Sequence, residues 1–143
     1  MNPSPDRLLE TFLLVDDLPA SRRFYRDVLG LRPYGRPSER GALFHLPGDQ
    51  VLGLVNRTDA RRPNTTPSGV VPACIPEGGA SAGAGTHLAF AVSEVASWRD
   101  RLAEAGVAIL EEVAWERGGR SLYFRDPDGN LLEVATPGVW EWY

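Results

Sequence analysis

The sequence predicts an α+β fold built from two tandem modules, each running strand, helix and then three further strands. Residues 85–92 alternate small or polar side chains with large apolar ones, the period of a half-buried β-strand. A strand followed by an amphipathic helix that ends at a glycine occurs twice, and each copy later contains a glycine turn. The corresponding positions are Glu10 and His87, Gly30 and Gly106, and Pro47-Gly48 and Asp128-Gly129.

Composition and length place limits on the class of protein. A chain of 143 residues is expected to form one domain, and 43% hydrophobic with 24% charged residues is typical of globular proteins. A net charge of −4 without a basic block argues against a nucleic-acid partner. Cys74 is the only cysteine, which excludes an internal disulfide. No apolar run resembles a signal peptide or a membrane span, so we expect a cytoplasmic protein without a membrane partner.

Module one is expected at about residues 8–55. Its first strand spans residues 8–15, and Asp16-Asp17 followed by Pro19 indicates the start of a helix. Gly30 is expected to end that helix. Short strands follow at about residues 31–34, 42–46 and 51–55, the last two joined by the turn at residues 47–50.

The segment between the modules, about residues 56–84, has no periodicity. Four prolines and a Gly/Ala/Ser tract at residues 78–83 predict an irregular loop. Loops of this length in small domains are usually functional or disordered, so this one is treated as a candidate cover for a site.

Module two is expected at about residues 85–136. After the strand at residues 86–92, Ser93 is the predicted N-cap of a helix that ends at Gly106. Val95, Trp98, Leu102 and Ala105 form its apolar stripe. Strands are predicted at residues 107–113, 121–125 and 131–135, with a hairpin turn at residues 126–130 and an aromatic tail at residues 137–143.

Three solitary polar side chains on separate strands suggest a metal centre: Glu10, His87 and Glu133. Strand alternation places Glu10 and Glu133 on the face opposite the apolar residues that cover the helices. Each residue also has an ordinary alternative. His87 alone suits a hydrogen-bonded core histidine, Glu10 a solvated strand end, and Glu133 an ion pair with Arg120 or Arg125.

Four segments, residues 10–21, 24–31, 86–90 and 121–133, resemble the vicinal-oxygen-chelate superfamily. That superfamily includes glyoxalase I, bleomycin-resistance proteins, fosfomycin-resistance enzymes and extradiol dioxygenases. The resemblance implies two βαβββ modules whose mixed sheets curl into a cup, with the helices outside and a metal inside.

The same resemblance places the ligand positions at Glu10, Gly53, His87 and Glu133. Glycine has no side chain to bind a metal, so the four-ligand arrangement of glyoxalase I is lost at Gly53. The remaining two carboxylates and one imidazole favour a hard divalent ion such as Mn²⁺, Fe²⁺ or Mg²⁺, or else Zn²⁺ or Ni²⁺. Three protein ligands leave positions for a substrate with two neighbouring oxygens.

Further site residues are predicted around these ligands. Tyr123 and Ser121 share one face of the strand beside Glu133, and the fosfomycin-resistance branch has a tyrosine at the corresponding place. Glu133 and Tyr123 are therefore the predicted catalytic residues, with Ser121 contacting the substrate. Tyr123 as a plain wall residue is the alternative.

Four other residues complete the predicted site. Phe12 and Leu14 share the face of Glu10 and are expected to line its apolar part. Trp115 could stack on a substrate or shield a sheet edge, and Arg120 could meet a substrate carboxylate or remain a solvated turn residue.

The predicted function is a metal-dependent, glyoxalase-like enzyme that acts on a small oxygenated organic molecule. The first expected reaction class is isomerase or lyase chemistry through a metal-stabilised enolate or alkoxide, and the second is oxygenase chemistry. The alternative is a bleomycin-resistance-like protein that sequesters a drug or metabolite, which the long loop and the tryptophans favour. The tail, with Trp140 and Trp142, predicts a homodimer or a cover over the cup mouth.

Overall fold

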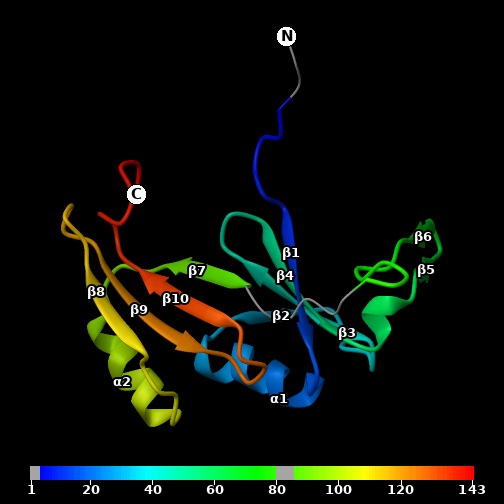
Figure 1. Ribbon diagram of the computed structural model, residues 1–143, viewed down its shortest axis with the longest axis horizontal. Helices are drawn as coiled ribbons and strands as arrows, with labels where there is room; N and C mark the ends of the chain where they lie inside the picture. The colour runs from blue at the N-terminus through cyan, green and yellow to red at the C-terminus, as the bar shows by residue number, and fades with distance from the viewer. Residues whose placement is uncertain (1–3, 80–85) are drawn as a thin grey trace. The chain divides into compact units, whose positions relative to one another are not determined.

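Two four-stranded mixed sheets carry the fold, one in each module (Figure 1). The computed structural model describes residues 4–79 and 86–143. The chain divides into two units, Met1–Ala82 and Gly83–Tyr143, which contain module one and module two. Each module runs strand, helix and three strands, so the predicted βαβββ duplication is confirmed.

Module one has the strand order β1-β4-β3-β2. β1 and β4 are parallel, and the other two neighbouring pairs are antiparallel. The elements are β1 (Glu10–Val15), α1 (Leu18–Arg23), the π-helical η1 (Phe24–Val28), β2 (Arg32–Tyr34), β3 (Gly41–Leu46) and β4 (Gln50–Asn56).

The helical segment of module one begins and ends where the sequence predicts. The Asp17 carboxylate accepts a hydrogen bond from the Ala20 backbone N–H at 2.9 Å, and Pro19 lies in the first turn. Gly30 follows the last turn with φ of +69°, a conformation that favours glycine. The helix is not uniform, because its second half is the π-helical turn η1.

Residues 56–79 are more ordered than the sequence predicts, so the expectation of a wholly irregular loop is wrong for them. They contain the 3₁₀ turn η2 (Asp59–Arg61) and a hairpin of β5 (Asn64–Thr66) and β6 (Gly69–Val71). The prolines stand outside these three-residue strands and do not interrupt their pairing. Most of the predicted Gly/Ala/Ser tract, residues 80–83, lies outside the described residues.

Module two has the strand order β7-β10-β9-β8, with β7 and β10 parallel. Its second strand, β8, begins at Glu111 and is therefore shorter than the predicted strand at residues 107–113. The elements are β7 (His87–Ala91), α2 (Ala96–Glu104), β8 (Glu111–Ala114), β9 (Arg120–Arg125) and β10 (Leu131–Ala135).

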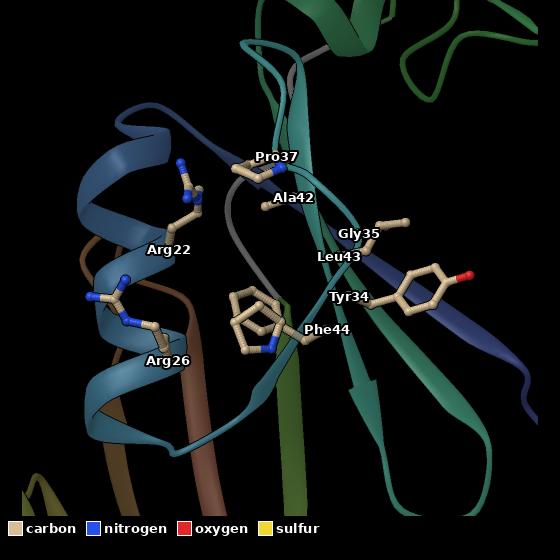
Figure 2. Close-up of a pocket in the computed structure, with 9 residues that line it drawn as sticks. Arg22, Arg26, Tyr34, Gly35, Pro37, Ala42, Leu43 and Phe44 are labelled. Carbon is tan, nitrogen blue, oxygen red and sulfur yellow. The ribbon is translucent and has the colours of Figure 1, made fainter.

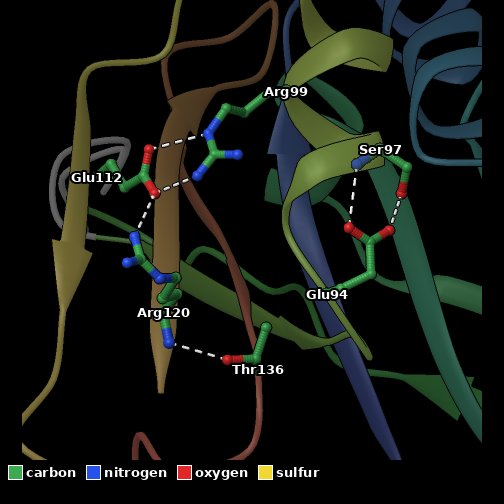
Figure 3. A network of polar contacts seen from close by, with 6 residues as sticks. All are labelled: Glu94, Ser97, Arg99, Glu112, Arg120 and Thr136. Carbon is green, nitrogen blue, oxygen red and sulfur yellow. Dashed lines mark hydrogen bonds and ion pairs between the residues drawn. The ribbon is translucent and has the colours of Figure 1, made fainter. Parts of the chain in front are cut away.

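The start of α2 also differs from the prediction. The N-cap position is Val95 rather than Ser93, and the Glu94 carboxylate accepts a hydrogen bond from the Ser97 backbone N–H at 3.1 Å (Figure 3). The Glu94 side chain, which is longer than that of the predicted cap Ser93, thus accepts from an N–H of the first turn that has no partner within the helix. Gly106 ends the helix with φ of +69°.

A charged network ties α2 to the sheet of module two (Figure 3). The guanidinium of Arg99 donates to both carboxylate oxygens of Glu112, and Arg120 donates to Glu112 Oε1 at 3.0 Å. The hydrogen bonds from Arg99 lower the pKa of the Glu112 carboxyl most strongly. The network therefore places the Arg120 guanidinium on the helix side of β9.

The core of each module lies between its sheet and its helix. Leu13 and Val15 of β1 are buried, as are Leu132 and Val134 of β10, which confirms the strand alternation inferred from the sequence. Glu10 and Glu133 consequently lie on the face of their own sheet that is turned away from the helix. Within the described residues, no helix is long and apolar enough to cross a membrane.

Candidate metal centre

The predicted ligand positions correspond in the strand registers of the two modules. In each module, the first and last strands are parallel neighbours. The predicted ligand position on the last strand pairs with the residue two places after the predicted ligand position on the first strand. The equivalent residues are Glu10 with His87, Phe12 with Ala89, and Gly53 with Glu133. The two sheets thus present the same three register positions with different side chains.

Module two brings two of the predicted ligands into contact. His87 Nε2 lies 3.0 Å from Glu133 Oε2, across the neighbouring strands β7 and β10. Glu133 is 5% exposed, whereas the His87 side chain is 44% exposed. Ala89, opposite Glu133, has only a methyl group, which leaves room beside the carboxylate for the imidazole. An imidazole and a carboxylate held this way on a sheet suit a divalent ion.

The second oxygen of Glu133 is held by a chain of hydrogen bonds. The Ser121 hydroxyl donates to Glu133 Oε1, and the Trp115 indole N–H donates to Ser121 Oγ at 2.9 Å. Ser121 is fully buried on β9. Glu133 therefore turns Oε1 toward Ser121 and Oε2 toward His87.

Tyr123 lies directly opposite Glu133 in the antiparallel pair of β9 and β10. Its ring centroid is 5.9 Å from that of His87, with the planes tilted by 49°. Burial raises the pKa of the Tyr123 hydroxyl, and the charge of the Glu133 carboxylate raises it further. The phenol consequently keeps its proton at neutral pH and is able to donate a hydrogen bond.

In module one, an aromatic ring covers the position that corresponds to Glu133. A Cβ atom added to Gly53 would lie 2.2 Å from Cε1 of Phe12, the residue directly opposite it in β1. No side chain fits there without displacing that ring. Module one accordingly offers Glu10, exposed on β1, while module two offers both His87 and Glu133.

A profile of the Glyoxalase/Bleomycin resistance protein/Dioxygenase superfamily matches residues 7–134. The chain belongs to this superfamily. The match covers both modules and every position considered above, including Glu10, Gly53, His87 and Glu133.

Several relatives extend this comparison. A lactoylglutathione lyase structure from Agrobacterium tumefaciens is 29% identical, with a TM-score of 0.80 over 96% of this chain and 98% of that one. A virulence protein of Salmonella typhimurium is 30% identical over 91% of this chain and 83% of its own length. The metallothiol transferase FosB of Shouchella clausii is 49% identical over 55 residues, or 36% of this chain. That match spans 38% of FosB.

The side chains present are consistent with the divalent metals used in this superfamily. The structure contributes the His87–Glu133 pair, and its imidazole and carboxylate are both common ligands of divalent ions. Among residues 4–79 and 86–143, no three His, Cys, Asp or Glu side chains form a single group. Glu10 belongs to the other unit of the chain.

Two predicted substrate residues take different positions. Trp115 reaches the site, where its N–H is directed to Ser121, a contact between side chains that the strand pattern does not show. Arg120 does not join the group around Glu133, because its guanidinium lies with Glu112 and Arg99 on the helix side of the sheet. Phe12 and Leu14 lie on the Glu10 side of β1, and Leu14 packs against Val55, Ala60 and Ile75.

A separate pocket lies on the helix side of module one (Figure 2). Arg22 and Arg26 come from the helical segment, and Tyr34 and Phe44 from the neighbouring strands. The Arg26 guanidinium is bonded to the adjacent Asp27 carboxylate. None of the predicted site residues lines this pocket.

Proposed function

We propose that this protein is a divalent-metal-dependent enzyme that acts on a small oxygenated molecule, with Glu10, His87 and Glu133 as the metal ligands. The observation that carries the proposal is the His87–Glu133 pair, 3.0 Å apart on adjacent strands at the ligand positions of the superfamily. Glu10 is proposed as the third ligand because it occupies in module one the register position that His87 occupies in module two.

The proposed ligand set determines which ions suit the site. Two carboxylates and one imidazole favour Mn²⁺, Fe²⁺ or Mg²⁺, and accommodate Zn²⁺ or Ni²⁺. When bound, such an ion acts as a Lewis acid that stabilises negative charge on a substrate oxygen.

The surrounding side chains have distinct proposed roles. Glu133 is available through Oε2, since Oε1 accepts the Ser121 hydroxyl. Tyr123 keeps its proton and donates a hydrogen bond to a substrate oxygen. Phe12 and Leu14 are proposed as apolar contact surface in module one, and Trp115, which is 38% exposed, in module two.

Lyase or isomerase chemistry is the leading reaction class, and oxygenase chemistry comes next. Similarity to a lactoylglutathione lyase supports the first, and partial similarity to a metallothiol transferase supports metal dependence and adds thiol transfer as a candidate. Phe12 over Gly53 argues against the four-ligand centre of glyoxalase I.

The decisive experiment loads the metal-stripped protein with each of the five ions and assays three substrate classes. These are lactoylglutathione, a thiol together with an oxygenated electrophile, and a catechol with oxygen. We expect turnover of one class that disappears with a chelator and returns with the ion. Tight binding of small molecules without turnover, equal with and without metal, would instead make the protein a sequestering one.

We also propose that the protein forms a homodimer through the tail, residues 137–143. The indoles of Trp140 and Trp142 stack with centroids 5.7 Å apart and are 60% and 81% exposed in the isolated chain. Two adjacent exposed indoles are a large apolar surface for a domain of this size, and a second copy would cover them. Light scattering at micromolar concentration should show a dimer, and replacing both tryptophans by Ser should give a monomer. A monomeric wild-type protein would contradict this.

A further inference from the structure

We propose that Trp115 and Ser121 are positioning residues that hold the Glu133 carboxylate so that Oε2 alone is presented beside His87. Their effect on metal binding rests on the proposed function. Their effect on the orientation of the carboxylate does not, because it follows from hydrogen bonds within module two.

The chain of hydrogen bonds can run in only one direction. An indole N–H is a donor and never an acceptor, so Ser121 Oγ accepts from Trp115. The one hydrogen of the Ser121 hydroxyl is then free to point to Glu133 Oε1. Since Ser121 is fully buried, water does not readily replace either partner. Oε1 is thereby kept as the acceptor of the Ser121 hydroxyl, and Oε2 is the oxygen presented beside His87.

Trp115 is itself held by the backbone around it. Its backbone N–H donates to the Gly119 carbonyl at 2.8 Å, which closes a tight turn after β8. That turn packs against the tail, because a Cβ on Gly119 would lie 2.4 Å from the carbonyl carbon of Gly138. The tail in turn is tied to the sheet by the Tyr143 hydroxyl, 3.1 Å from the last carbonyl oxygen of β10. The donor at the start of the chain is therefore fixed in place.

Removing this support should free the carboxylate to rotate. In Ser121→Ala, Oε1 loses its donor, and Glu133 can turn either oxygen toward His87. Outer partners of metal ligands typically change affinity by about 10–100-fold, and we expect a loss in that range. Trp115→Phe keeps an aromatic side chain but removes the pyrrole ring with its N–H, so Ser121 can still reach Glu133 and the loss should be smaller.

The first measurement uses the metal-free protein and follows the indole N–H signals by NMR. Trp115 is assigned from the spectrum of Trp115→Phe, and Trp98, whose ring packs under Arg101 on α2, is the internal control. We expect the Trp115 indole N–H to exchange more slowly in the wild type than in Ser121→Ala, where its acceptor is removed. It should shift in Ser121→Ala and Glu133→Gln while the Trp98 signal stays unchanged. A rapidly exchanging Trp115 N–H that ignores both substitutions would overturn the proposal.

The second measurement titrates Mn²⁺ into the wild type, Ser121→Ala, Trp115→Phe and the matched control Trp98→Phe. The expected order of affinity is wild type and Trp98→Phe, then Trp115→Phe, then Ser121→Ala. Normal affinity in both site variants would overturn the positioning role and leave the proposed function intact. A wild type that binds no metal would overturn the proposed function and the metal part of this inference. Should Ser121→Ala fail to fold, Trp115→Phe decides the outcome.

Discussion

Replacing His87 by Ala, or Glu133 by Gln, is expected to abolish tight divalent-ion binding while the fold survives. We expect affinity to fall by more than about 100-fold, beyond the range typical of outer partners, because each change removes a proposed ligand. Glu133→Gln preserves the shape of a side chain that is 5% exposed and still accepts the Ser121 hydroxyl, so it should unfold near the wild-type temperature.

Glu10→Gln extends the test to module one. If Glu10 is the third ligand, the affinity loss of Glu10→Gln should match that of Glu133→Gln, although Glu10 is exposed on β1. Calorimetric titration of the metal-stripped variants gives the comparison. Binding should also weaken as pH falls, since protons compete for the imidazole and carboxylates.

Glu112→Gln is the matched control for Glu133→Gln. It removes the same charge from the same module, but Glu112 lies with Arg99 and Arg120 on the helix side of the sheet. It should leave metal affinity unchanged. Wild-type affinity in all three ligand variants, or an equal loss in the control, would refute the assignment of the ligands.

Gly129→Val is expected to lower both stability and metal affinity. Gly129 has φ of +82°, and a β-branched residue in that region costs about 1–3 kcal/mol. The turn also depends on the buried Asp126 carboxylate, which accepts hydrogen bonds from the backbone N–H groups of Asp128 and Asn130, both at 2.9 Å. β10 begins immediately after this turn, and a one-residue slip would reverse the face on which Glu133 lies.

Gly48→Val offers a matched comparison. Gly48 has the same φ of +82°, and no atom lies within 4 Å of an added Cβ at either position. Its turn belongs to module one and precedes β4, so it leaves the register of β10 untouched. Both variants should unfold at lower temperature, and Gly129→Val alone should also weaken Mn²⁺ binding by disturbing Glu133 directly. A folded Gly129→Val protein with normal affinity would show that the turn does not orient Glu133.

Much of the fold could be predicted because its signals are local and repeated. Alternation in β10 separates Leu132 and Val134 from Glu133, and each residue of the strand adds to the same period. Asp17 and Gly30 mark helix ends through backbone chemistry that acts within a few residues. The short hairpin of β5 and β6 escaped prediction because three-residue strands are too short to establish a period.

The sequence by itself determined the duplicated βαβββ order, the face on which Glu133 lies and the absence of a side chain at Gly53. Only the tertiary structure decided that His87 and Glu133 touch, that Phe12 covers Gly53, and that Arg120 turns to Glu112. It alone also showed the path from Trp115 through Ser121 to Glu133. The reason is physical. A side chain's face follows from its own strand's alternation, whereas its partner depends on the register of a neighbouring strand and on the shapes packed between them.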